Sequence, residues 1–172
     1  MLNYGAQSQL YFNHNSDNLA NAGLSENDKL LTDKSAMELS GYTYNVTDSD
    51  ADIDFAGQLI SLNNKITAKI YFTDNSGGTF DISDFTVTSG GTSVDSSRLT
   101  TGSDTNGQYL SISGIGAGDF DQTFEISAGD VTISNYSVFS YISQALNNAD
   151  SRLVDVARAI YDYNKSVEDY IS

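Results

Sequence analysis

The chain has 172 residues, no cysteine, one histidine and a net charge of −15, from 23 acidic and 8 basic residues. Without cysteine it cannot form disulfides or cysteine-ligated metal centres, and one histidine cannot build a multi-histidine metal site. Such an acidic surface disfavours nucleic acid and anionic membranes, and no apolar run is long enough to span a bilayer. We therefore expect a protein that is not an enzyme.

The first 40 residues predict a short helix and a polar connector. Residues 1–12 have helical spacing, with Met1, Tyr4, Ser8, Tyr11 and Phe12 expected on one face. The connector over residues 13–40 is rich in asparagine. Its expected anchors are four leucines: Leu19, Leu24, Leu30 and Leu31.

Residues 41–139 predict a β-sandwich. Residues 65–73 alternate apolar and polar side chains, which is typical of a half-buried strand. Asn63-Asn64 predicts a hairpin back to a strand at 54–62, and Asn106-Gly107 predicts a second hairpin. Further strands are expected at residues 80–82, 85–88, 109–113, 122–127 and 131–139. Short strands separated by glycine and asparagine turns favour an antiparallel, Ig-like β-sandwich.

The region 140–172 predicts a long amphipathic helix. Apolar residues recur every three or four positions after Asp150, namely Leu153, Val156, Ala157, Ile160, Tyr163, Val167, Tyr170 and Ile171. Asn147-Asn148 is expected to cap the helix. The predicted fold class is thus mainly β with flanking helices, arranged as one structural module.

The two ends of the chain resemble each other. Residues 1–12 align without gaps on residues 160–171, and Tyr4 matches Tyr163 while Tyr11 matches Tyr170. One interpretation is two unrelated amphipathic helices that happen to carry tyrosines. The other is one period of a tandem array, taken from a longer protein. The chain starts without a signal-peptide pattern, which agrees with the second interpretation.

Both terminal segments resemble a family of bacterial surface proteins. Residues 4–21 read YGAQSQLYFNHNSDNLAN and resemble the signature YGAAAQxYFxYNTDNLAN of large secreted or wall-attached proteins of gut Firmicutes. Residues 159–170 resemble the closing ALYxYxxAAExYF of the same family. His14 stands where the family has an aromatic residue, and residues 165–167 replace its run of small residues.

The resemblance implies an extracellular, non-catalytic repeat module of a secreted or cell-wall-attached protein. The family includes immunoglobulin-binding, superantigen-like proteins of Lachnospiraceae, so we expect a host protein as partner, with an immunoglobulin variable domain as the first candidate. A carbohydrate-binding module and a structural spacer remain the alternatives. The chain has no tryptophan, which sugar-binding platforms usually use, and this disfavours the carbohydrate alternative.

Four tyrosines are the candidate ligand-binding residues: Tyr42, Tyr44, Tyr71 and Tyr109. They fall in predicted strands or the approaches to them, and alternation places Tyr71 on the polar side of its strand. Exposed tyrosines are good anchors for protein or sugar ligands. Ordinary packing at the edge of the core is the alternative for all four.

Four aspartates at every second position form a candidate calcium site: Asp48, Asp50, Asp52 and Asp54. Calcium-binding loops favour this spacing, but Ile53 and Leu59 stand where an EF-hand has its turn glycine and its bidentate glutamate. The alternative is a solvated strand face without any cofactor.

Charge is distributed unevenly along the chain. Arg98 is the only basic residue between Lys69 and Arg152, an interval that carries ten acidic residues. We expect a negative surface there that attracts basic partners, although solubility alone also explains it.

Overall fold

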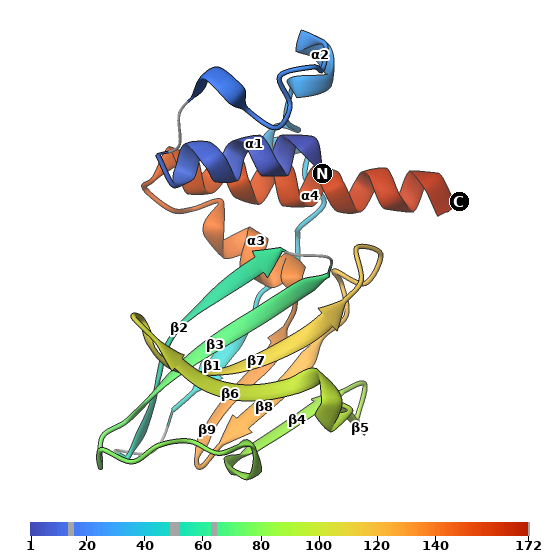
Figure 1. The fold of residues 1–172 in the computed structure, drawn as a ribbon. Coiled ribbons are helices and arrows are strands. Elements are labelled where there is room, and N and C mark those ends of the chain that lie inside the picture. Colours follow the sequence, from blue (N-terminus) through green and yellow to red (C-terminus); the bar gives the residue numbers. More distant parts are fainter. Residues whose placement is uncertain (14–15, 49–51, 63–64, 172) are drawn as a thin grey trace. The chain divides into compact units, whose positions relative to one another are not determined.

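The computed structural model describes residues 1–13, 16–48, 52–62 and 65–171 (Figure 1). The chain divides into two compact units. The helical unit comprises Met1–Gly41 and Tyr141–Ser172, and the sandwich unit comprises Tyr42–Ser140. The predicted fold class is confirmed, because antiparallel strands in two sheets are flanked by a short N-terminal and a long C-terminal helix.

The helical unit contains α1 (Leu2–Tyr11), η1 (Ser16–Asn18), α2 (Glu26–Lys29), η2 (Lys34–Ala36) and α4 (Ser151–Ile171). Helix α3 (Val138–Ala145) begins in the sandwich unit and ends in the helical unit. The strands of the sandwich unit are β1 (Asn45–Thr47), β2 (Ile53–Leu62), β3 (Ile66–Asp74), β4 (Phe85–Ser89), β5 (Thr92–Ser93), β6 (Leu99–Asp104), β7 (Gly107–Ile115), β8 (Phe124–Ala128) and β9 (Val131–Tyr136). Two short 3-10 helices lie between them: η3 (Ile82–Asp84) and η4 (Ser96–Arg98).

Two antiparallel sheets enclose the core of the sandwich unit. Their strand orders are β1-β9-β8-β4-β5 and β2-β3-β7-β6. The aromatic rings of Phe72 on β3 and Phe85 on β4 lie 5.2 Å apart, so the two sheets meet through large apolar side chains. The alternation read in residues 65–73 is confirmed, since Ile70 and Phe72 are almost completely buried.

Two local predictions within the sandwich differ from the structure. Residues 82–84 form η3, because Asp81 and Asp84 build a reciprocal capping box that closes a helical turn. The second hairpin turns at residues 105–106, one position earlier than expected, and Gly107 is already paired with Asp104. Gly107 has a φ of +126°, which explains why glycine is needed at this position. The predicted Asn63-Asn64 turn lies outside the described residues.

The predicted strand at 131–139 is wrong in its last residues, where α3 begins. The Ser137 and Ser140 side chains each accept a hydrogen bond from the other residue's backbone N–H, at 3.0 and 2.8 Å. This reciprocal cap starts a helix. The first residues of α3 are buried on every side, so they carry no polar alternation and resemble a buried strand in sequence.

The faces predicted for the terminal helices are also partly wrong. In α1 the only buried residue is Ala6, whereas Phe12 is 67% exposed. In α4, Tyr170 is 91% exposed, and Asp150 takes the capping role expected of Asn147-Asn148 by accepting the Arg152 N–H at 3.0 Å. Helices α1 and α4 lie side by side (Figure 1), and their buried residues include Ala6 on α1 and Ala159 on α4.

The connector is held to α4 mainly by polar contacts. The Arg158 guanidinium donates to the carbonyl oxygens of Leu31 and Thr32 at 2.8 and 2.9 Å, and the Asp162 carboxylate accepts from the Thr32 N–H. Of the predicted leucine anchors, Leu30 is 72% exposed. No helix in the described part of the chain is long and apolar enough to cross a membrane.

Candidate functional site

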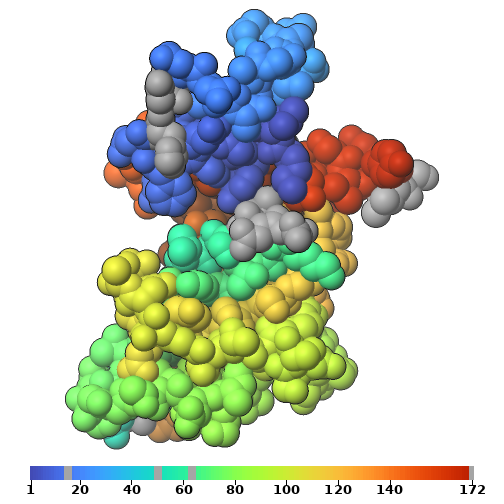
Figure 2. Space-filling model, viewed as in Figure 1, coloured from blue at the N-terminus to red at the C-terminus, as the bar shows by residue number. Residues whose placement is uncertain are grey.

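The outward face of the β2-β3-β7-β6 sheet, on the side away from the core, is the candidate site. In the space-filling view, atoms of β3 and β6 face the viewer in green and yellow-green (Figure 2). Strand register places two rows of neighbours across this face. One row is Gly57, Tyr71, Tyr109 and Gly102, and the other is Leu59, Lys69, Ser111 and Thr100.

Four side chains on this face form a connected group, which we call the Lys69 cluster: Lys69, Tyr71, Asp104 and Tyr109. The Lys69 ammonium donates to Asp104 at 2.9 Å and lies 3.9 Å from the centre of the Tyr109 ring. The Tyr71 hydroxyl donates to the same carboxylate oxygen at 3.1 Å. The Tyr71 and Tyr109 rings meet edge to face, with centroids 5.8 Å apart. Each member is thus held by at least one other.

The charges of the cluster support one another. The hydrogen bond from Lys69 lowers the pKa of Asp104, and the same bond raises the pKa of Lys69. Burial raises the pKa of Tyr71, so this hydroxyl stays protonated and acts as a donor. At neutral pH the cluster therefore has a fixed ion pair and a neutral phenol.

Local backbone features place these groups. The β6–β7 hairpin puts Asp104 at the end of β6, where its carboxylate also accepts the Asn106 N–H at 2.9 Å. Tyr109 leans over Gly102 on the neighbouring strand, and a Cβ at position 102 would stand only 2.8 Å from the Tyr109 hydroxyl. Glycine at position 102 is therefore required for this orientation of the ring.

The four candidate tyrosines do not converge. Tyr71 and Tyr109 lie in the Lys69 cluster, where Tyr71 is only 4% exposed although it is on the outward face. Tyr42 packs edge to face on Phe139 at 4.9 Å. Tyr44 packs between the rings of Phe55 and Tyr136, and its hydroxyl accepts from Gln58 at 3.1 Å.

The four candidate aspartates do not share one strand. Asp48 follows β1, Asp54 belongs to β2, and Asp50 lies outside the described residues. The Asp54 carboxylate accepts from the Asn75 side-chain amide at 3.0 Å. Within the described ranges, no group of three or more potential metal-ligating side chains is assembled. Calcium binding by this segment stays a prediction.

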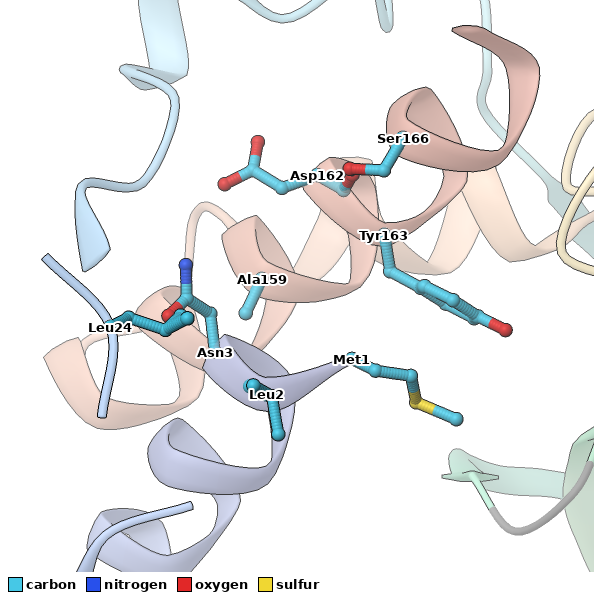
Figure 3. Close-up of a pocket in the computed structure, with 8 residues that line it drawn as sticks. All are labelled: Met1, Leu2, Asn3, Leu24, Ala159, Asp162, Tyr163 and Ser166. Carbon is cyan, nitrogen blue, oxygen red and sulfur yellow. The ribbon is translucent and has the colours of Figure 1, made fainter. Parts of the chain in front are cut away.

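A separate open hollow of about 300 Å³ lies in the helical unit (Figure 3). Its walls are Met1, Leu2, Asn3, Leu24, Ala159, Asp162, Tyr163 and Ser166. Three of its polar side chains already bond within the chain: Asn3 with Asn21, Asp162 with the Thr32 N–H, and Ser166 with the Asp162 carbonyl. We therefore place the candidate site on the sheet.

Sequence reasoning missed part of the site. Lys69 and Asp104 are 35 residues apart, and their pairing depends on the order of three strands. Residues 54–62 predict a strand, but nothing in the sequence around Leu59 indicates that its side chain is 39% exposed. The one available signal was the alternation of side chains along the strand, which places Lys69 and Tyr71 on the same polar side.

Comparisons of the chain with protein-family models, with curated proteins and with solved structures found no match.

Proposed function

We propose that this chain is a non-catalytic binding module that engages a protein partner through the outward face of the β2-β3-β7-β6 sheet. The observation that carries the proposal is the Lys69 cluster. It presents a half-buried tyrosine ring and a lysine in a fixed arrangement, and the exposed Leu59 lies beside Lys69 by register. Protein interfaces gain most of their affinity from such fixed aromatic and apolar anchors surrounded by polar side chains.

The surroundings of the cluster fit a protein ligand. Polar side chains lie beside it, including Thr100 and the buried Ser111, whose hydroxyls are 2.6 Å apart. Side chains that are already fixed lose little conformational entropy on binding. The net charge of −15 favours a basic partner surface and speeds its encounter with the module.

The partner we propose first is an immunoglobulin variable domain, on a secreted or wall-attached bacterial protein. Support for this identity comes from the resemblance of residues 4–21 and 159–170 to the surface-protein family. A carbohydrate ligand and a spacer role are the competing outcomes of the test.

Binding to polyclonal Fab fragments, measured by biolayer interferometry with the whole chain, tests the proposal. We expect Tyr109→Ala and Lys69→Gln each to weaken binding at least tenfold, since each removes a central contact of about 1.4 kcal/mol or more. Tyr170→Ala and Lys29→Gln are matched controls in the helical unit, and both should bind as the parent chain does. Binding only to a glycan array, or no binding to either, would reject the immunoglobulin partner.

A further inference from the structure

The turn between β6 and β7 contains the only asparagine–glycine pair of the sequence, Asn106-Gly107. The tip of this hairpin projects at one end of the sheet (Figure 1), and both residues are exposed. Gly107 has a φ of +126°, and a Cβ at this position would meet no other described atom within 4 Å. The turn therefore leaves open space beside the peptide bond that joins the two residues.

An asparagine that precedes glycine is chemically labile. The backbone nitrogen of the glycine loses its proton to solvent and attacks the side-chain carbonyl carbon, and the side-chain nitrogen leaves as ammonia. The resulting succinimide ring takes up a water molecule and opens to aspartate or to isoaspartate. Glycine favours the attack because it has no side chain in the way and its backbone adapts easily. Asparagine is among the residues that thermophilic proteins avoid for such lability.

Asn106 is also bonded to the Lys69 cluster. Its backbone N–H donates to the Asp104 carboxylate at 2.9 Å, and its side chain is hydrogen-bonded to the Tyr71 hydroxyl. The Tyr71 hydroxyl in turn donates to Asp104 at 3.1 Å. A change of charge or of backbone length at Asn106 would therefore act directly on two members of the cluster.

We propose that Asn106 deamidates spontaneously and that its contact with Tyr71 couples this modification to the Lys69 cluster. The attacking atom is the Gly107 nitrogen, and the amide nitrogen of Asn106 is the leaving group. The product has a carboxylate close to that of Asp104. The Tyr71 hydroxyl has a single proton and can donate to only one of these two carboxylates, which also repel each other. In the isoaspartate product the main chain is longer, which disturbs the turn that holds Asp104.

A second asparagine gives an internal comparison. Asn75 lies in an exposed turn and precedes the small residue Ser76. Its side-chain amide donates to Asp54 at 3.0 Å, and the Ser76 N–H, whose nitrogen would attack, donates to Asp74 at 2.8 Å. Both groups of the reaction are thus already held, and serine has a side chain that glycine lacks. We expect Asn75 to deamidate more slowly than Asn106.

Peptide mapping by mass spectrometry, after the whole chain has aged at pH 8, tests the modification. We expect Asn106 to gain about 1 Da, as a mixture of aspartate and isoaspartate, at least about tenfold faster than Asn75 does. Asn106→Gln is the matched control, because its longer amide side chain forms the ring far less readily, and it should stay unmodified. An unmodified Asn106, or deamidation of Asn75 first, would overturn the proposal.

The contact with Tyr71 can be tested through the same rate. The Asn106 side chain must leave this hydrogen bond before it reacts, so Tyr71→Phe should speed deamidation about two- to tenfold, the range that loss of one hydrogen bond allows. Tyr44→Phe removes a hydroxyl that bonds to Gln58 in the same unit, and it should leave the rate unchanged. Equal rates in the parent chain and Tyr71→Phe, or equal acceleration by Tyr44→Phe, would show that the cluster does not restrain Asn106.

The effect on partner binding rests on the proposed function, whereas the modification itself does not. Ion exchange separates the deamidated chain from the parent chain by its additional negative charge. The deamidated form should bind Fab fragments about tenfold more weakly, because the cluster has lost a contact. Asn106→Gln, aged in the same way, should keep its affinity. Equal affinity of the two forms would overturn the coupling, whereas a parent chain that fails to bind before ageing would contradict the proposed function alone.

Discussion

The two units of the molecule are stabilised in different ways. The sandwich unit is held by large apolar side chains from two sheets, such as Phe72 and Phe85. The helical unit buries large side chains such as Ile160 together with small ones such as Ala6, but it also fastens its connector with polar contacts from Arg158 and other side chains. The comparison shows that burial of large side chains gives a clear pattern in the sequence, whereas polar contacts between distant segments give almost none.

The largest expected effect is in the core of the sandwich unit. Phe72→Ala should lower the free energy of unfolding by about 3–5 kcal/mol, because it leaves a cavity among packed aromatic rings. Urea unfolding followed by circular dichroism measures the change. The exposed Phe12→Ala is the matched control, and a similar loss there would contradict the assignment of the core.

The next effect concerns a buried tyrosine of the helical unit at high pH. Burial raises the pKa of Tyr141 to about 12, compared with 10 in the unfolded chain. The folded state therefore holds this proton more tightly than the unfolded chain does. The contribution of Tyr141 to the free energy of unfolding is fully present below pH 10 and is lost as the pH rises towards 12. The loss should reach about 2–3 kcal/mol.

Thermal unfolding of the parent chain and of Tyr141→Phe between pH 9 and 12 measures this contribution. The variant has no phenol at this position, so its stability should fall less steeply with pH. Identical slopes for the two proteins would show that Tyr141 ionises as an exposed tyrosine does.

A smaller effect is expected where the connector meets α4. Arg158→Ala removes the donors to the carbonyl oxygens of Leu31 and Thr32 and should cost about 1–3 kcal/mol. Hydrogen exchange at residues 31–33 should speed up. Arg152, which is more exposed and bonds mainly to Asp150, is the control, and Arg152→Ala should destabilise the chain less than Arg158→Ala does.

The smallest effect is at the Lys69 cluster. The hydrogen bond from Lys69 lowers the pKa of Asp104 in the folded state. The contribution of this carboxylate to the free energy of unfolding is therefore fully present above the pKa that Asp104 has in the unfolded chain. It is lost as the pH falls through the lower pKa of the folded state. Thermal melts from pH 6 to pH 2 should therefore show a weaker acid dependence for Asp104→Asn than for the parent chain. Equal acid dependence would show that the bond to Lys69 does not persist in solution.

The longer strands β2, β3 and β7 could be predicted from their turn signals and, in β3, from clear alternation, whereas the short strands β1 and β5 could not. The start of α3 could not, since Val138 and Phe139 are buried apolar residues that a strand continuing from β9 would also carry. In α1, the tyrosine spacing predicts a large apolar face, whereas the buried residue of the helix is Ala6. Small residues carry little hydrophobic signal, so their burial follows only from the position of the opposite helix.

The candidate site was predictable only in part. Parity placed Tyr71 on the outward side, but its burial results from Tyr109 and Asp104, which come from other strands. Cross-strand contacts of this kind depend on register, which a single strand does not encode. Tyr42 and Tyr44 are also tyrosines in or near predicted strands, yet they do not join the cluster: Tyr42 packs against Phe139 and Tyr44 against Phe55.

Glycine at position 102 links two positions that could otherwise vary independently. Any larger residue there would displace the Tyr109 ring and, with it, the surface under the Lys69 ammonium. In related sequences, a residue larger than glycine at position 102 should therefore appear together with a residue smaller than tyrosine at position 109. A lineage could thus change the shape of this face through one paired substitution, without altering the core.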